Sequence, residues 1–354
     1  MGLEEYKLLR KMPQNGTVAV YSGAHPAHQE MLAGCCDESI KMLGEWSPGK
    51  QTAGAKKLIA YLSTALSIRA SSAKVAVIEG TIPTVLMAPI INCLNRRPKP
   101  VIALCAEDAL YRIFVTGGSL KQLITRWGFQ FVSGIITNSD QTANLIRSNL
   151  GSVPIETRYP SIPEERIRLF SSAEPLLDSH NLILIGGGSQ FCKGVDIATK
   201  CLEILRGKFP DIRLTVLGFP DLKETPGLVS PGSVDDILPY LSTSSVLIHP
   251  GRGEAFGLAI IEAMLAGVVP FVSEWTGASS IVKEAASNLV VPLCAEDFAS
   301  RIAVFWNDTP DHRQTLSAKC RQVALDFSLK ALKQPSLAPF IEYIASNKLN
   351  STLT

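Results

Sequence analysis

Hydrophobic residues alternate along the chain between short continuous runs and longer segments with helical spacing. The runs TVAVYS (17–22) and KVAVIE (74–79) are bounded by turn residues, and AKKLIAYLSTALSIRAS (55–71) lies between them. Similar runs follow at 100–105 and 134–139. Continuous apolar runs that alternate with helical segments predict a parallel sheet whose two faces are covered by helices.

The alternation is interrupted once and then restarts. The segment RYPSIPEERIRLFSSAEPLLDSH (158–180) is rich in Pro, Ser and charged residues, which predicts an interdomain linker. The second half therefore forms a second α/β unit, and two doubly wound Rossmann-like domains facing a cleft are expected, over 1–165 and 181–330. The strands expected in the second half are 181–186, 212–218, 245–250, 268–273 and 288–293, and its helices fall near 193–207, 234–243, 256–266, 295–306 and 311–327.

The charge of the chain is unevenly distributed, although the formal net charge is only +2. Residues 1–168 hold 19 Lys and Arg against 13 Asp and Glu, and the remainder holds 15 against 19. This distribution suits an anionic ligand or an anionic surface better than duplex nucleic acid. Ordinary scatter of surface charge is the other interpretation.

The eight cysteines form no C-x-x-C pair, and most lie in apolar patterns where a thiol acts as a small hydrophobic group. We therefore expect a reducing, cytoplasmic compartment and no structural zinc. The run IPTVLMAPIINCL (82–94) is too short to span a bilayer.

Two glutamates stand out in HPGRGEAFGLAIIEAMLAG (249–267). Glu254 lies in a glycine-rich turn after a strand, where a ligand can approach the backbone closely. The amides of Ala255, Phe256 and Gly257 are expected to open the next helix and, with its dipole, to bind phosphate oxygens. Glu262 follows Leu258 by four residues and should point inward. Alternatively, Glu254 only compensates the helix dipole and Glu262 is partly exposed.

This stretch resembles the retaining group 1 (family 4) nucleotide-sugar glycosyltransferases, which have the GT-B fold. The resemblance implies that Glu262 binds the ribose hydroxyls of the donor and that Glu254 contacts the donor sugar. Carboxylates accept hydroxyl hydrogens well, which suits both roles. The matching residues are Pro250, Glu254, Phe256, Gly257, Glu262, Ala263, Gly267 and Pro270.

A second stretch, LILIGGGSQFCKGVDIATKCLEIL (182–205), resembles another segment of the same family. Lys193, Gly194 and Asp196 match, but the position of the family's arginine falls in the glycine run that ends at Gly188. The resemblance implies that Lys193 meets the donor diphosphate, with Gly188 in the adjoining donor loop. A solvated lysine at a helix start is the alternative.

A third, weaker match is SPGSVDDILPYL (230–241), which resembles the loop and helix whose backbone meets the nucleobase. It would place Ser230, Pro231 and Gly232 near the base. A Pro-Gly pair also marks an ordinary turn.

The first half resembles the family less. Gly23 and His25, after the first strand, are candidates to lie near donor and acceptor, but His25 could equally be a structural turn residue. The family's histidine after the strand PVIALC is absent, and Glu107 or Asp108 stands nearby. The segment 109–129 mixes basic and apolar residues, so it is either a contact for an anionic membrane surface or a domain helix with solvated charges.

Together these features predict a retaining hexosyltransferase-like enzyme that transfers a sugar from a nucleotide diphosphate donor to a sugar, lipid or protein acceptor. Glu254, Lys193 and His25 are the catalytic candidates, and neither metal nor cofactor is expected because no D-x-D pair or acidic cluster occurs. A non-catalytic GT-B subunit that binds a nucleotide sugar or glycan is the main alternative. A GT-B-fold epimerase or phosphorylase is a third hypothesis.

The tail, 331–354, should form a helix that crosses back to the first domain, as in the GT-B fold. Its apolar stripe comprises Leu337, Phe340, Ile341 and Ile344, which share one helix face. The alternative is a helix that packs only on its own domain.

Overall fold

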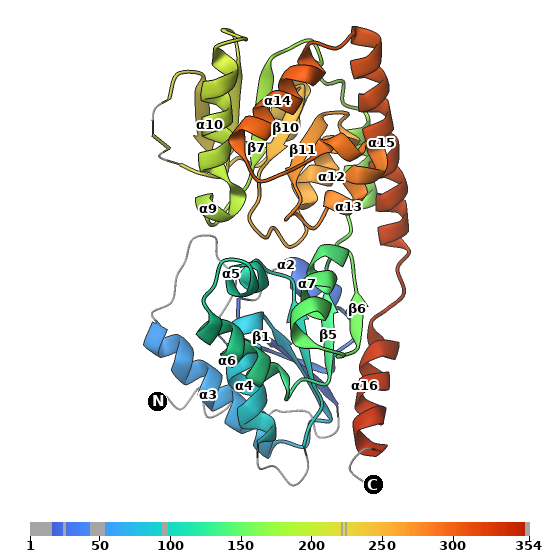
Figure 1. Cartoon of the computed structure of the whole chain (residues 1–354). Coiled ribbons are helices and arrows are strands. Elements are labelled where there is room, and N and C mark those ends of the chain that lie inside the picture. Colours follow the sequence, from blue (N-terminus) through green and yellow to red (C-terminus); the bar gives the residue numbers. More distant parts are fainter. Residues whose placement is uncertain are drawn as a thin grey trace. The chain divides into compact units, whose positions relative to one another are not determined.

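The computed structural model describes residues 16–23, 26–42, 54–93, 98–220, 222–223 and 225–350, and the chain forms two compact units (Figure 1). Unit 1 comprises Met1–Tyr159 with Pro335–Thr354, and unit 2 comprises Pro160–Gln334. Within the described residues, no helix combines the length and apolar character needed to cross a membrane.

Unit 1 contains a six-stranded sheet in the order β2-β1-β3-β4-β5-β6, and every neighbouring pair is parallel. Because the order reverses between β1 and β3, the carboxyl ends of these two strands mark the topological switch point of this sheet. The strands are β1 (Thr17–Tyr21), β2 (Glu38–Lys41), β3 (Val75–Glu79), β4 (Val101–Cys105), β5 (Gly134–Thr137) and β6 (Ile155–Thr157).

Helices cover both faces of this sheet, because successive strand residues point to opposite sides. Val18 and Val20 pack into one core cluster with residues of α3, α4 and α7, whereas Ala19 and Tyr21 pack into the other. The first half of the chain supplies the helices α2 (Pro26–Met31), α3 (Gly54–Ala70), α4 (Thr81–Asn92), α5 (Ala109–Phe114), α6 (Ser119–Phe129) and α7 (Asp140–Leu150).

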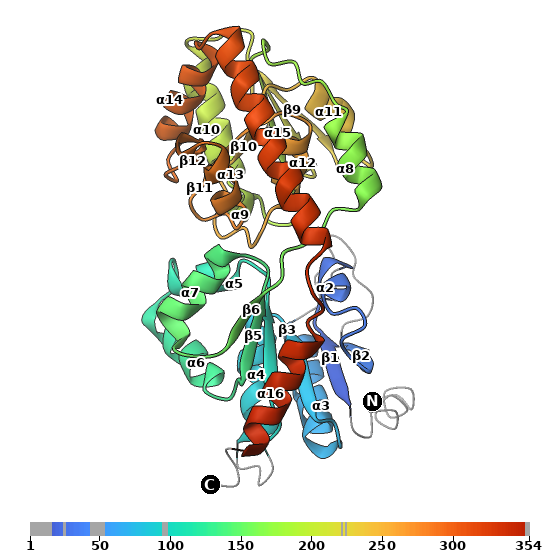
Figure 2. The same ribbon diagram turned by 90° about the vertical axis from the view of Figure 1, so that its right-hand side faces the viewer.

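The tail forms α16 (Ala338–Asn350), which covers the second face of the first sheet (Figure 2). Leu337, Ile341 and Ile344 are buried there, and Phe340 packs against them. The predicted apolar stripe is thus the surface by which α16 packs on unit 1. The approach is close, because a Cβ at Gly134 in β5 would lie 2.9 Å from Ile344 Cδ1.

Unit 2 contains a second parallel six-stranded sheet, in the order β12-β11-β10-β7-β8-β9. This is the Rossmann order, whose switch point lies between the first and fourth strands, here β7 and β10. The strands are β7 (Asn181–Ile185), β8 (Arg213–Leu217), β9 (Leu228–Gly232), β10 (Val246–His249), β11 (Val269–Ser273) and β12 (Val290–Val291).

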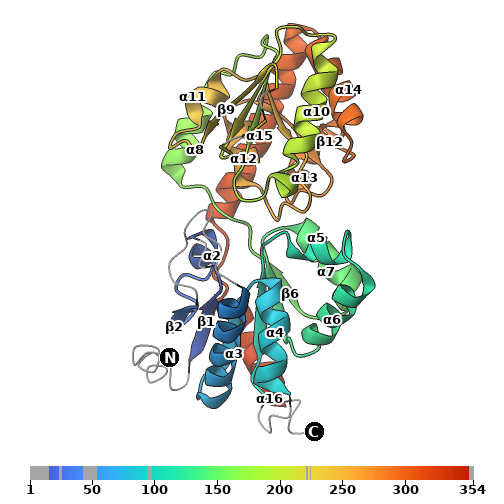
Figure 3. The ribbon, with the colours of Figure 1, turned by 90° about the vertical axis from the view of Figure 1, so that its left-hand side faces the viewer.

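The helices of unit 2 also pack in two groups: α10 with α14, and α8, α12 and α13 with α15 (Figure 3). They comprise α8 (Glu164–Ser171), α9 (Gln190–Lys193), α10 (Val195–Arg206), α11 (Leu238–Ser242), α12 (Leu258–Leu265), α13 (Ser279–Ala285), α14 (Ala295–Trp306) and α15 (Pro310–Leu332), together with the short 3-10 helix η1 (Ser287–Leu289).

The segment 158–180 differs from its prediction as a linker. It contains the helix α8, which belongs to unit 2 and buries Ile167 and Phe170. Helix formation follows from this burial, since the two residues share one helix face. The stretch Ser230–Gly232, expected in a loop, ends the edge strand β9, where a proline is tolerated.

Truncation of Ile344 should destabilise unit 1. Ile344→Ala removes a fully buried side chain at the α16 contact, so we expect a loss of about 2–4 kcal/mol. Hydrogen exchange should become faster in the strands of unit 1 while those of unit 2 remain protected. Tyr343→Ala is the control, because the side chain of Tyr343, the residue next to Ile344, is 55% exposed. Equal effects of the two variants would contradict the packing role of Ile344.

Candidate functional site

The switch point of the second sheet brings two of the predicted residues together. β7 continues through a glycine loop into α9, which ends at Lys193, and β10 continues through a loop that contains Glu254 into α12. The carboxyl ends of β7 and β10 are adjacent because these strands pair directly. Lys193 and Glu254, 61 residues apart, therefore meet.

The turn between α9 and α10 touches the loop after β10 through its backbone. Gly194 follows Lys193 with φ 70°, and a Cβ at this position would lie 2.0 Å from the carbonyl oxygen of Pro250. Only glycine fits such a contact. Ser189 caps α9 by accepting a hydrogen bond from the Cys192 amide, so the turn that carries Lys193 is held at both ends.

Lys193 and Glu254 form a largely buried ion pair, and His249 stands beside it. The Lys193 ammonium donates to Glu254 Oε2, and His249 Nε2 lies 3.6 Å from the same oxygen. Burial opposes the charged form of Glu254, but Lys193 and His249 outweigh it and hold the pKa of Glu254 below its usual value. Burial lowers the pKa of His249, although Glu254 favours its charged form.

Sequence reasoning missed His249, which ends β10 and is completely buried. A histidine at the end of a buried strand, five residues before a candidate glutamate, was the available signal. The loop from β11 holds the same region, because Gly277 N donates to Glu254 O at 2.8 Å and Ser273 Oγ donates to Gly251 O.

Arg252 fastens α9 to the loop after β10. Its guanidinium donates to both Asp196 oxygens at 2.7 and 2.8 Å, donates to Phe191 O at 2.8 Å, and stacks on the Phe191 ring. Burial opposes ionisation of Asp196, but the hydrogen bonds and charge of Arg252 lower its pKa. Arg252 is thus paired with Asp196 in this structure.

Glu262 points inward as predicted, but it has a partner that the sequence did not reveal. Arg166 of α8 donates through Nε to Glu262 Oε1 at 2.7 Å, and its guanidinium lies 5.1 Å from the centre of the Phe170 ring. Burial raises the pKa of Glu262, against the opposing effect of Arg166. The pairing depends on α8 packing against α12, which a linker prediction excludes.

The start of α12 differs from the expectation. The helix begins at Leu258, with Gly257 as its N-cap at φ 93°, so Ala255, Phe256 and Gly257 lie in the loop before it. A left-handed glycine there breaks the helical path earlier than the apolar pattern indicated. Elsewhere, Gly188 at φ 76° lies in the loop after β7, and Gly232 at φ 80° ends β9.

The switch point of unit 1 also gathers polar groups. His28 Nδ1 lies 2.5 Å from Glu79 Oε1, and Gly23 N donates to Glu79 Oε2 at 2.8 Å. Glu107 accepts from Thr81 N at 2.7 Å, and burial raises its pKa. Glu79 was missed although it ends the apolar run KVAVIE.

Two of the sequence candidates in unit 1 have different outcomes. His25 lies outside the described residues. Asp108 comes just before α5 and pairs with Arg112 at 3.0 Å on the surface.

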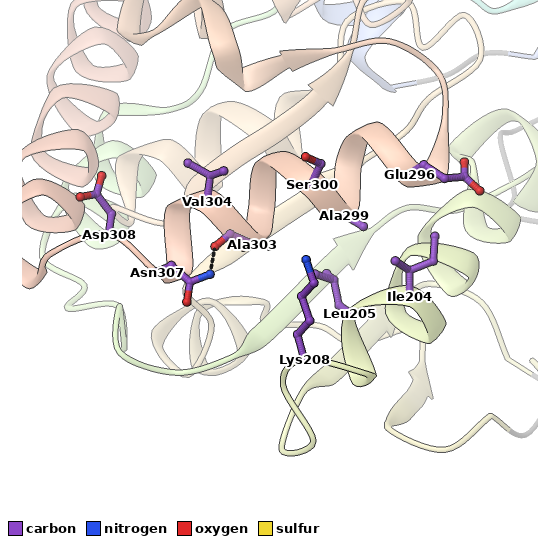
Figure 4. A pocket seen from close by; sticks show the side chains of 10 residues that line it. All are labelled: Ile204, Leu205, Lys208, Glu296, Ala299, Ser300, Ala303, Val304, Asn307 and Asp308. Atoms are coloured by element: carbon purple, nitrogen blue, oxygen red, sulfur yellow. Dashed lines mark hydrogen bonds between the residues drawn. The ribbon is translucent and has the colours of Figure 1, made fainter.

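A groove lies between the ends of α10 and α14 (Figure 4). It is lined by Ile204, Leu205, Lys208, Glu296, Ala299, Ser300, Ala303, Val304, Asn307 and Asp308. None of the candidate donor residues lines it. Across the parts of the chain that the structure describes, no group of three or more His, Cys, Asp and Glu is arranged to hold a metal ion.

Comparison with known proteins finds a family model that is similar to part of the chain. Residues 179–308 match the family described as "Glycosyl transferases group 1". A phosphatidyl-myo-inositol mannosyltransferase of Propionibacterium freudenreichii is 32% identical over 78 residues, which cover 21% of this chain. That match spans about a fifth of the length of the curated relative, 20%.

Solved structures match nearly the whole chain at low identity. Sucrose-phosphate synthase from Thermosynechococcus elongatus has a TM-score of 0.65 and 15% identity, and 96% of this chain and 99% of that chain are covered. HepE of Anabaena in complex with UDP and glucose has a TM-score of 0.61 at 13% identity, with 95% and 98% covered. WaaG, a glycosyltransferase involved in lipopolysaccharide biosynthesis, has a TM-score of 0.55 at 14% identity, with 93% and 98% covered. The predicted GT-B fold is confirmed.

The ion pair predicts a pH-dependent effect of Glu254→Gln. Because the folded-state pKa of Glu254 is depressed, its stabilising contribution is present above about pH 4.5 and is lost as the pH falls further. We expect the variant to destabilise unit 2 by about 1–3 kcal/mol at pH 7. The difference in the free energy of unfolding between the variant and the unmodified protein should become smaller below pH 4.5.

Urea unfolding, monitored by hydrogen exchange in unit 2, measures this difference in the free energy of unfolding across the pH range. Glu203→Gln is the control, because Glu203 forms an exposed pair with Lys200. A difference for Glu254→Gln that does not change with pH would contradict the depressed pKa.

Proposed function

We propose that the protein is a retaining glycosyltransferase that binds a nucleotide diphosphate sugar in unit 2 and transfers the sugar to an acceptor. The observation that carries the proposal is the meeting of Lys193 and Glu254 at the Rossmann switch point, inside the region that matches the group 1 family. Ligands of open α/β sheets bind at such switch points.

In this proposal the donor diphosphate replaces Glu254 as the ion-pair partner of Lys193. Phosphate oxygens compete for the ammonium, with help from the loop amides of Ala255, Phe256 and Gly257. Glu254 then accepts hydroxyl hydrogens of the donor sugar, and His249 stays beside its carboxylate, 3.6 Å away. The existing ion pair thus holds both side chains in place before the donor arrives.

The nucleoside end of the donor meets Glu262 and the end of β9. Glu262 accepts the ribose hydroxyls, and Arg166, which donates to Oε1, orients this carboxylate and opposes the effect of burial on its pKa. The turn at Gly232, together with Gly188, lies near the base and the phosphates. HepE, which shares the fold, was solved with UDP, so a uracil nucleotide is the first donor to test.

The chemistry is mainly electrostatic. The bond between the sugar C1 and the β-phosphate oxygen breaks, and the acceptor oxygen attacks C1 on the same face. The acceptor proton passes to the departing phosphate, whose growing negative charge Lys193 stabilises. In unit 1, His25 and the Glu79–His28 pair, which lies at that unit's own switch point, are the candidates to bind the acceptor.

The main experiment screens nucleotide sugars by thermal shift and then measures nucleoside diphosphate release with and without acceptors. Release that requires an acceptor, with a glycosylated product of retained anomeric configuration, would support the proposal. Binding without any release would favour the non-catalytic subunit. Conversion of the donor to a different sugar nucleotide would favour an epimerase.

Lys193→Ala should weaken the binding of UDP by about tenfold or more while leaving uridine binding nearly unchanged. The variant removes the cation for the diphosphate and leaves Glu254 to repel it, so the double variant Lys193→Ala/Glu254→Gln should recover part of the loss. Lys200→Ala is the control, because this lysine is exposed on α10. If calorimetry shows that the variant loses equal affinity for UDP and for uridine, Lys193 does not contact the diphosphate.

Glu262→Ala should weaken the binding of UDP by about 1–3 kcal/mol, because the ribose hydroxyls lose a charged acceptor. The same substitution should have little effect on 2′,3′-dideoxy-UDP, which lacks those hydroxyls. Titration calorimetry of both ligands measures this difference. A similar loss for both ligands in a folded variant would exclude the ribose role.

A further inference from the structure

Helix α6 turns its apolar stripe away from the core of unit 1. Leu120, Leu123, Ile124 and Trp127 are 69%, 63%, 46% and 50% exposed. Their i, i+3, i+4, i+7 spacing places them on one helix face, which in a domain helix normally packs inward. The face that packs inward is instead built around Gly128, where a Cβ would lie 2.9 Å from Val85 Cα of α4.

Basic residues flank this stripe without neighbouring acids. Lys121 and Arg126 are exposed on α6, and no ion pair joins either of them to a carboxylate among the described residues. Between Asp108 and Asp140 the sequence has three basic residues and no acid. Long basic side chains beside an apolar stripe can keep their charges in water while their stems cover apolar surface.

Helix α3 repeats the same combination in the same layer. Leu58, Leu62 and Leu66 recur every four residues and, with Ile59, are 40% to 62% exposed. Lys56 and Lys57 are exposed at its start, and the helix contains no acid. Both α3 and α6 pack against α4 (Figures 1 and 3). We call the exposed stripes of α3 and α6, with their flanking lysines and arginine, the basic apolar surface.

We propose that the basic apolar surface docks unit 1 on the surface of an anionic lipid bilayer. Large exposed apolar surface marks an interaction site, and a basic polar flank with apolar residues including Trp is the composition of helices that lie in the bilayer interface. The positive charge of this surface favours an anionic bilayer over a second copy of the chain. Two copies that met through the same surface would bring like charges together.

Trp127 fits the interfacial position. Its ring packs edge-on against Phe131, with centroids 5.4 Å apart, while half of the side chain stays exposed. Trp prefers the headgroup level, where its ring contacts acyl chains and its N–H meets polar groups. The proposal does not depend on the proposed glycosyl transfer, since it uses residues that belong to unit 1 alone.

The test is sedimentation of the full chain with vesicles of phosphatidylcholine alone or with roughly 30% phosphatidylglycerol. We expect binding only to the anionic vesicles, reversed by about 0.5 M salt. Lys121→Ala/Arg126→Ala should lower the partition coefficient by about fivefold for each residue removed. Leu123→Glu should lower it by about tenfold or more.

Matched controls separate the surface from general effects. Val304→Glu changes an apolar residue of unit 2 that is 66% exposed, and Lys200→Ala removes an exposed lysine of that unit, so both should bind as the unmodified chain does. Thermal unfolding of Leu123→Glu and of the two controls should be unchanged, because these side chains are exposed. Arg126 also donates to Asn149 O at 3.1 Å, so the thermal unfolding of Lys121→Ala/Arg126→Ala is measured beside its vesicle binding. Brominated lipids should quench fluorescence in the unmodified chain and not in Trp127→Phe.

Three results would overturn the proposal. One is no binding to anionic vesicles, and another is equal binding by the surface variants and the controls. The third is concentration-dependent dimerisation without vesicle binding that Leu123→Glu abolishes, which would assign the surface to a second copy of the chain.

Discussion

The close contact between Gly194 and Pro250 is the constraint on which the candidate site depends. It brings the turn between α9 and α10 against the loop after β10, with no room for a side chain between them. Lys193 and Glu254 then stand close enough to pair, and Arg252 can reach Asp196 and Phe191. The charged groups are close because the two backbone segments are in contact. Glycine permits this contact, and the ion pair stabilises it.

The sequence predicts the sheets well where strands are buried on both faces. β3 and β4 are continuous apolar runs, and such runs have few alternatives inside an α/β unit. β2, β6 and β9 escaped prediction because they are edge strands with half-exposed residues and no apolar run. Their conformation comes from pairing with a neighbour, which local sequence does not encode.

Some residues of the candidate site could likewise be predicted from the sequence, and others could not. Glu254, Lys193 and Glu262 could be found because their spacing in the chain carries the resemblance to a family. Arg166 could not, because its partner is 96 residues away and its helix forms only by packing on α12. The approach of His249 to Glu254 could not be found either, because only the fold brings its Nε2 to 3.6 Å from Glu254 Oε2. Motifs identified the residues, whereas tertiary packing determined their partners and protonation.

The return of α16 to unit 1 sets an order of events on the ribosome. Unit 2 is one continuous segment, so it can complete its core as soon as Gln334 has left the exit tunnel. Unit 1 begins first but must wait for Leu337, Ile341 and Ile344 to cover the second face of its sheet. The segment made first is thus finished last, and a nascent chain carries an open apolar face that a chaperone can hold until residue 344 has left the exit tunnel.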